Sequence, residues 1–153
     1  MARLSDLHAA SRTRLSELDC PSYDDQPWVQ PPALNQSRIA IISSAALIRR
    51  GDPVFMPSDT GWRPIPHALP DGDVLVSHVS INFDRTGLQQ DLEVAFPRRR
   101  LDALTEAGEI GAVGSTHYTF MGSNDPKVLD QTTRDIAGRL KADRIDAAIL
   151  VPV

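Results

Sequence analysis

A strong helix pattern at residues 124–143 leads almost directly into the apolar run DAAILVPV. Asp125 can cap this helix and Pro126 suits its first position, while apolar residues recur along one face. The apolar run is typical of a strand that is buried on both faces. A helix that feeds a strand in this way favours a parallel sheet with helices packed against it.

Three shorter apolar runs predict the other strands, at residues 38–43, 74–80 and 110–120, the last of which includes a loop. A second helix is expected after Pro97, and Gly108 suits the position just past its end. Strands therefore alternate with helices along the chain. We expect the α/β fold class, with a mostly parallel sheet, helices packed on it and Rossmann-like layering.

The N-terminal region differs from the rest of the chain. Leucines at roughly helical spacing predict an amphipathic helix over residues 3–18, and four prolines within residues 20–32 predict an extended linker. We therefore expect an N-terminal helix and Pro-rich linker at residues 1–37, followed by an α/β domain at residues 38–153. Within that domain, residues 49–66 are rich in Gly and Pro and indicate a loop.

Composition argues against several classes of site. A net charge of −4 and a pI of about 5.5 give no reason to expect binding to nucleic acid or to an anionic membrane. Cys20 is the only cysteine, so the chain can form neither an internal disulfide nor a cysteine-based zinc site. No glycine pattern matches a phosphate-binding loop, no histidine pair has zinc spacing, and no apolar run is long enough to span a membrane. The N-terminus lacks the apolar stretch of a signal peptide, so we expect a cytoplasmic protein with no metal or cofactor of its own.

Polar residues gather in loops that are expected at strand ends, where functional side chains are common. His78 and His117 are candidates for proton transfer or for holding an anion. Arg63 and Arg85 can each form a fork onto a substrate carboxylate, and Asp84 can orient the Arg85 guanidinium. The alternatives are structural: hydrogen-bonded histidines, and a local ion pair between Asp84 and Arg85.

Several motifs in one order make the chain similar to the selenoprotein B family, which supplies a subunit of glycine, sarcosine, betaine and D-proline reductases. The similarity runs from about residue 38 to residue 153, and the length most resembles the proline-reductase type. The motifs are DTGWRPIP, VSH, FP followed by RL, GEIG, TH followed by FMG, and the closing AAILVPV.

The resemblance implies an oxidoreductase that cleaves a carbon–nitrogen bond of a small amino-acid substrate as part of a complex. It implies a partner subunit that carries a pyruvoyl group, and a thiol reductant or thioredoxin-like protein as the source of electrons. It leaves open which substrate is used and whether the chain also forms a homo-oligomer.

In that family the strand that matches AAILVPV is followed directly by selenocysteine, or by cysteine in some relatives. The resemblance therefore implies a nucleophile just after Val153, encoded by a UGA codon that can be mistaken for a stop, and a chain that is inactive without it. The alternative is a non-catalytic α/β binding or scaffold subunit that has lost the redox end. The bases downstream of the last codon discriminate between the two.

Overall fold

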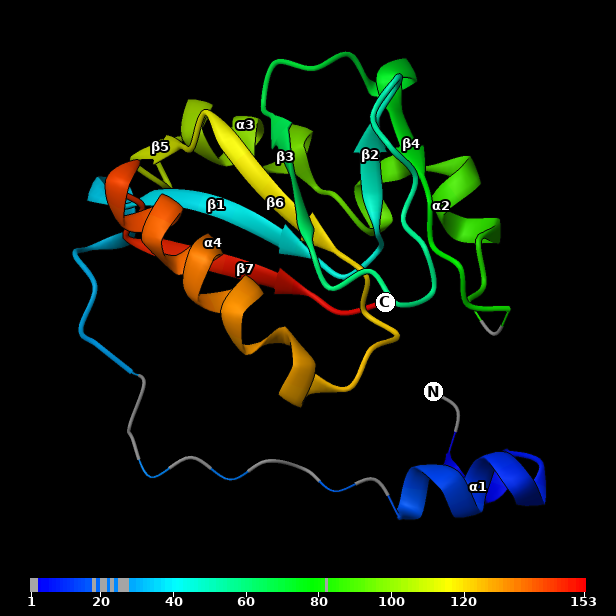
Figure 1. The fold of residues 1–153 in the computed structure, drawn as a ribbon. Helices are drawn as coiled ribbons and strands as arrows, with labels where there is room; N and C mark the ends of the chain where they lie inside the picture. Colours follow the sequence, from blue (N-terminus) through cyan, green and yellow to red (C-terminus); the bar gives the residue numbers. More distant parts are fainter. Residues whose placement is uncertain (1–2, 18, 20–21, 23, 25–27, 82) are drawn as a thin grey trace.

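The computed structural model describes residues 3–17, 19, 22, 24, 28–81 and 83–153. Its main sheet has five strands, and β1 lies in the interior of that sheet (Figure 1). β5 and β6 pair in parallel with the two halves of β1, and β7 pairs in parallel along β1 from Ile39 to Ser43. β3 pairs antiparallel with β6. The strands are β1 (Arg38–Ser43), β3 (Trp62–Pro66), β5 (Ala112–Val113), β6 (Thr116–Phe120) and β7 (Ala147–Val151). The predicted α/β fold with a mostly parallel sheet is confirmed.

Helices cover both faces of this sheet. The crossover from β6 to β7 runs through a 3-10 turn, η5 (Pro126–Leu129), and α4 (Asp130–Ala142), which lies across the near face in Figure 1. The other face holds the main core, where Ile39 and Ile41 of β1 pack with residues of α2 (Thr86–Gln90) and α3 (Arg98–Glu106). The two predicted helices, the one that leads into β7 and the one after Pro97, are therefore present as α4 and α3.

The first turn of α3 shows how an arginine-rich helix start is stabilised. The buried Glu93 carboxylate, from the 3-10 turn η4 (Leu92–Val94), accepts hydrogen bonds at 3.1 Å from the backbone amides of Arg99 and Arg100. Arg98 is only 4% exposed, and its guanidinium donates to three backbone carbonyls and to Asp71. The helix dipole stabilises a negative charge at the helix N-terminus. The Glu93 carboxylate therefore offsets the unfavourable effect of the arginines in this first turn.

Two strand predictions differ from the structure. The run at 74–80 forms only β4 (Val74–Val76), which pairs antiparallel with β2 (Leu47–Arg49) in a separate two-stranded sheet. The predicted loop at 49–66 contains β3, whose Pro64 and Pro66 are tolerated because β3 pairs with β6 on one side only. A 3-10 turn, η3 (Asp71–Asp73), leads into β4.

β7 is a strand, as predicted, but the expectation that it is buried on both faces is wrong. Among the described strands it pairs with β1 alone, which makes it an edge of the sheet. Leu150 is 70% exposed and Ile149 is 37% exposed. The strand is therefore more apolar than is usual for a strand with this exposure in the described structure.

The N-terminal helix is shorter than predicted. A 3-10 turn, η1 (Leu4–Asp6), precedes α1 (Ala9–Ser16), and neither buries a residue. Figure 1 shows α1 apart from the sheet, and a further turn, η2 (Leu34–Gln36), leads into β1. The division at residue 37 stays a prediction, and Cys20 lies outside the described residues. In the described part of the chain, no helix has both the length and the apolar character that a membrane span needs.

Candidate functional site

The carboxyl ends of β1 and β7 meet the loop after β6, which is where open parallel sheets place their functional groups. The Val153 amide donates to the Ser44 hydroxyl oxygen at 2.9 Å, and the Ser44 amide donates to the Val151 carbonyl at 3.1 Å. Gly122 lies so close that a Cβ on it would stand 2.5 Å from the Cβ of Ser44. Ser44 and Gly122 therefore fix the backbone at Val153.

A hollow of about 400 Å³ adjoins this point. It is largely open to solvent and brings the 78–84 loop beside the loop that follows β6. Its described lining residues are His78, Ser80, Phe83, Asp84, Gly122, Ser123 and Val153.

His78 is the buried titratable group of the hollow, with 7% of its surface exposed. Its Nδ1 accepts a hydrogen bond from the Ser80 amide at 3.2 Å, so the neutral ring carries its proton on Nε2. That Nε2 is buried and, in the part of the chain that the structure describes, has no hydrogen-bond partner. Burial, and secondly the charge of Arg85, lower the pKa of His78 below its ordinary value. The ring is therefore a neutral donor at neutral pH whose donor group is unused.

Arg85 supports the shape of the 78–84 loop. Its guanidinium donates to the carbonyls of His78 at 2.5 Å, Phe83 at 3.1 Å and Ser80 at 3.2 Å. The Phe83 ring also packs against the His78 ring, with centroids 4.4 Å apart. These contacts fix the orientation of the His78 ring, and they occupy the guanidinium nitrogens that a substrate carboxylate would need.

Asp84 is exposed and interacts with its own chain neighbour. Its carboxylate accepts from the Thr86 amide at 2.9 Å, and hydrogen bonds from Thr86 lower the pKa of Asp84. Among the described contacts, Asp84 makes no ion pair with Arg85. It is an ionised carboxylate at the mouth of the hollow.

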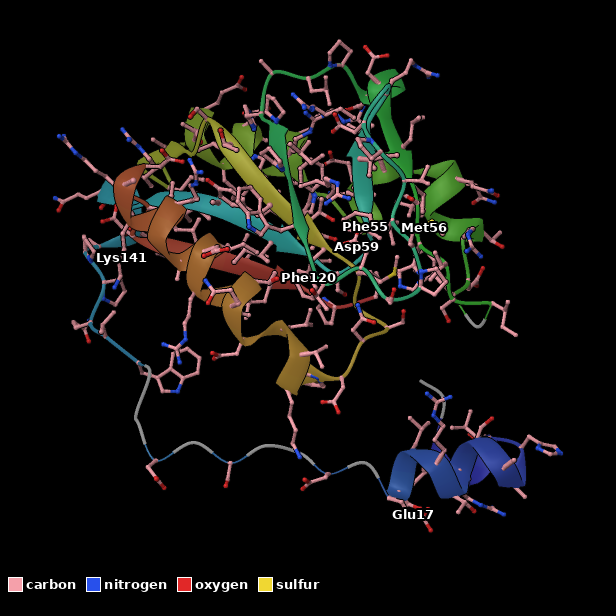
Figure 2. The ribbon with its side chains drawn as sticks, in the orientation of Figure 1. Glu17, Phe55, Met56, Asp59, Phe120 and Lys141 are labelled. Carbon is pink, nitrogen blue, oxygen red and sulfur yellow. The ribbon has the colours of Figure 1, made fainter. Side chains whose placement is uncertain are left out.

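Arg63 lies outside the residues that line this hollow. Its guanidinium pairs with Asp59 at 2.9 Å and stacks over the Phe55 ring at 4.4 Å. Figure 2 shows both partners on the segment between β2 and β3. Its Nε is buried and has no partner among the described residues, but the ion pair and the stacking hold the side chain against the fold.

His117 occupies a different part of the molecule. It is fully buried in β6, where its Nδ1 accepts from the Ile41 amide at 3.1 Å and its Nε2 lies 3.0 Å from Nδ1 of His67. The Nε2 of His67 lies 2.8 Å from the Asp102 carboxylate on α3. Burial, then the charges of His67 and Arg98, lower the pKa of His117 to about 3.

A second hollow of about 500 Å³, almost wholly apolar, lies between α4 and the carboxyl ends of β1 and β7. Phe120, labelled in Figure 2, lines it with Ile136 of α4 and the exposed Leu150 of β7. Within the described ranges, no cluster of three His, Cys, Asp or Glu side chains could hold a metal ion.

The chain is similar to D-proline reductase subunit gamma of Acetoanaerobium sticklandii. The two are 28% identical over 139 residues, which cover 88% of this chain and 57% of the relative. The chain thus spans somewhat more than half the length of that protein. No protein-family model matches the chain, and no solved structure matches it.

The structure brings together only part of the site set predicted from sequence. His78 and Asp84 line one hollow with Val153. Arg85 instead binds backbone carbonyls of the same loop, and Arg63 pairs with Asp59 outside the hollow. His117 is level with the middle of β1 rather than its carboxyl end. The roles proposed for these residues stay predictions.

Sequence reasoning missed the partners of His117. His67 is 50 residues from His117 in the sequence, and Asp102 is 35 residues from His67. They lie on separate elements, so no local spacing in the sequence indicates that they meet. The antiparallel pairing of Ile65 with His117 brings His67 into place, and that pairing lies in a segment that was expected to be a loop. Recognising residues 62–66 as a strand would have been the only available signal.

Proposed function

We propose that this chain forms the platform of a subunit of a D-proline or glycine reductase-type complex, which cleaves a carbon–nitrogen bond with a selenocysteine or cysteine that follows Val153. The similarity to a D-proline reductase subunit supports the class of reaction. The observation that carries the proposal is the position of Val153, held by Ser44 beside the hollow that contains His78.

The chemistry is covalent catalysis. A selenolate or thiolate attacks the substrate carbon, and the nitrogen leaves with the electron pair of the broken carbon–nitrogen bond. A thiol then attacks the selenium or sulfur, which releases the carbon to take up a proton and leaves a selenium–sulfur or disulfide bond. The dithiol reductant reduces that bond and restores the nucleophile. A partner subunit with a pyruvoyl group would supply the carbonyl that captures the substrate amine. In this chain, Ser44 and Gly122 orient the backbone that leads to the nucleophile, and His78 offers an N–H donor to an anion beside it.

The edge position of β7 supports the same proposal. A parallel strand of five apolar residues is normally covered on both faces, yet Leu150 is 70% exposed beside an apolar hollow. Further chain after Val153 would cover this surface and would place a helix near the nucleophile.

The coding sequence gives the first test. An in-frame UGA, followed by a cysteine codon and a helix-coding stretch, supports the reductase. A UAA or UAG followed by unrelated sequence would instead favour a non-catalytic scaffold subunit.

An activity assay gives the second test. The protein is extended through the next coding stretch and combined with the pyruvoyl subunit, D-proline and a dithiol, and ring opening is measured. Glycine, sarcosine and betaine are tried in parallel as substrates of the same class. The 153-residue chain is expected to show no turnover. Turnover by the 153-residue chain that survives Cys20→Ser would contradict the proposal.

A further inference from the structure

The candidate site contains one buried donor that the fold leaves unused. His78 is 7% exposed, and its Nε2–H has no acceptor among the described residues, although an unpaired buried N–H is energetically costly. The rest of the ring is firmly held, by the Ser80 amide on Nδ1 and by the Phe83 ring against its face. A donor that is oriented so well and left without a partner indicates a ligand that supplies the acceptor.

The two arginines proposed as carboxylate clamps are occupied elsewhere. The Arg85 guanidinium donates hydrogen bonds to three backbone carbonyls, and Arg63 is paired with Asp59 outside this hollow. Arg85 nevertheless tethers the His78 carbonyl, so it holds the histidine in place. His78 and Asp84 both line the hollow, which therefore combines a buried neutral histidine with an exposed carboxylate.

We infer that His78 is the residue that recognises the substrate carboxylate, through a hydrogen bond from Nε2–H to one carboxylate oxygen. Asp84, in the same hollow, accepts a hydrogen bond from the amino group of the same molecule. This inference rests on the proposed function and assigns the recognition of its substrate to a histidine instead of an arginine.

Charge explains the selectivity of such a pair. A neutral donor beside an ionised carboxylate disfavours a simple anion, because Asp84 repels it, but it suits a molecule that carries both a carboxylate and an amino group. Amino acids are therefore expected to bind better than acetate, and an amine without a carboxylate leaves His78 unpaired.

Binding is tested by following the ring nitrogens of His78 in the ¹⁵N-labelled protein by NMR. D-proline should shift the Nε2 resonance of His78, acetate should shift it less, and pyrrolidine should leave it unchanged. The ring nitrogens of His117 are the internal control, because both are already hydrogen-bonded in the core. Equal shifts from D-proline and pyrrolidine, or no shift from either, would overturn the inference.

Kinetics in the assembled complex provide an independent measurement, which also applies if a variant is poorly folded in isolation. His78→Leu removes the donor and should raise KM for D-proline about 10- to 100-fold with a smaller change in kcat, whereas His78→Gln retains an N–H donor and should recover most of the loss. His8→Leu, on the exposed N-terminal segment, is the matched control. A fall in kcat with KM unchanged would show that His78 serves the reacting groups and would overturn carboxylate recognition.

The two proposals fail in different ways. If the extended complex has no reductase activity, the proposed function fails, while the NMR titration still decides whether His78 binds a carboxylate. If the complex is active but His78→Leu leaves KM unchanged, the recognition role fails and the proposed function stands.

Discussion

Nδ1 of His67 lies 3.0 Å from Nε2 of His117, and this contact joins the surface carboxylate of Asp102 to the backbone of β1. The Ile41 amide donates to Nδ1 of His117, so the proton of neutral His117 is on Nε2 and points to His67. His67 must then accept on Nδ1 and donate from Nε2 to Asp102. The bond from the Ile41 amide therefore requires His117 to be neutral, because a proton on its Nδ1 would break that bond.

The first prediction is a loss of stability in acid. The pKa of His117 is about 3 in the folded protein against an ordinary value of 6.5, so between these values the unfolded chain binds a proton that the folded chain does not. The stability is complete above about pH 6.5 and falls as the pH drops towards 3. The lowered pKa of His78 acts in the same direction. The full difference for His117 corresponds to about 5 kcal/mol as an order of magnitude.

Urea unfolding between pH 4 and pH 8 measures this effect. His117→Asn keeps an acceptor for the Ile41 amide but does not titrate, so it should be less stable at pH 8 and show a shallower dependence on pH. His8→Asn, at an exposed position, should leave the slope unchanged. A wild-type stability that is flat from pH 8 to pH 4.5 would contradict the assignment.

The second prediction concerns the close contact at the end of β1. Gly122→Ala places a Cβ 2.5 Å from the Cβ of Ser44, so it should lower the free energy of unfolding by about 1–3 kcal/mol. Gly138→Ala on α4 is the matched control, because its Cβ would meet no atom within 4 Å and alanine favours a helix. Gly138→Ala should leave stability unchanged or raise it by up to about 1 kcal/mol. Thermal unfolding of both variants checks this, and equal effects would show that Gly122 is not sterically required.

The third prediction is that Arg98 stabilises the fold, whereas the nearby Arg100 does not. Arg98→Lys removes the planar fork that contacts the carbonyls of Pro66, His67 and Leu69, so it should destabilise the protein by about 2–3 kcal/mol. Arg100→Lys, two residues later at an exposed position, should change stability by less than about 0.5 kcal/mol. Chemical unfolding of the pair is the measurement, and a difference below its error would rule out the proposed anchoring role.

The fourth prediction tests whether further chain covers β7. In the 153-residue protein, Leu150→Ser should cost little, because Leu150 is 70% exposed. In a version extended through the next coding stretch, the same change should cost about 1.5–3 kcal/mol, because the leucine is then buried. Leu104→Ser on α3, where the leucine is 41% exposed, should cost the same in both lengths. An equal cost of Leu150→Ser in both proteins would count against a covering segment.

The sequence was most informative where local signals agreed. Asp125 and Pro126 marked the start of the segment that leads into α4, and the apolar runs located β1 and β7. β4 was predicted as part of a longer strand, whereas β2 and β3 lie outside the predicted strands. In β3, Pro64 and Pro66 weaken the strand pattern. The pairing of these strands depends on tertiary contacts with β6 and on each other.

The site was less predictable than the fold. His78 was identified from its place after a strand, but its unpaired Nε2 depends on a loop that Arg85 holds through backbone carbonyls. No residue pattern reports that a guanidinium will bind carbonyls instead of a substrate. The exposure of β7 also escaped prediction, since an apolar run indicates that a strand can be buried and does not indicate what covers it.

Turnover of the extended protein, with selenocysteine in the position that follows Val153, is the decisive measurement. With the pyruvoyl subunit, dithiol and a substrate of this class, we expect reductive cleavage, with D-proline as the first substrate to try. Cysteine in that position should give slower turnover, since less of a thiol is ionised at neutral pH, and serine should give none. Turnover that is unaffected by serine in that position would contradict the account, as would no turnover with selenocysteine on D-proline, glycine, sarcosine and betaine.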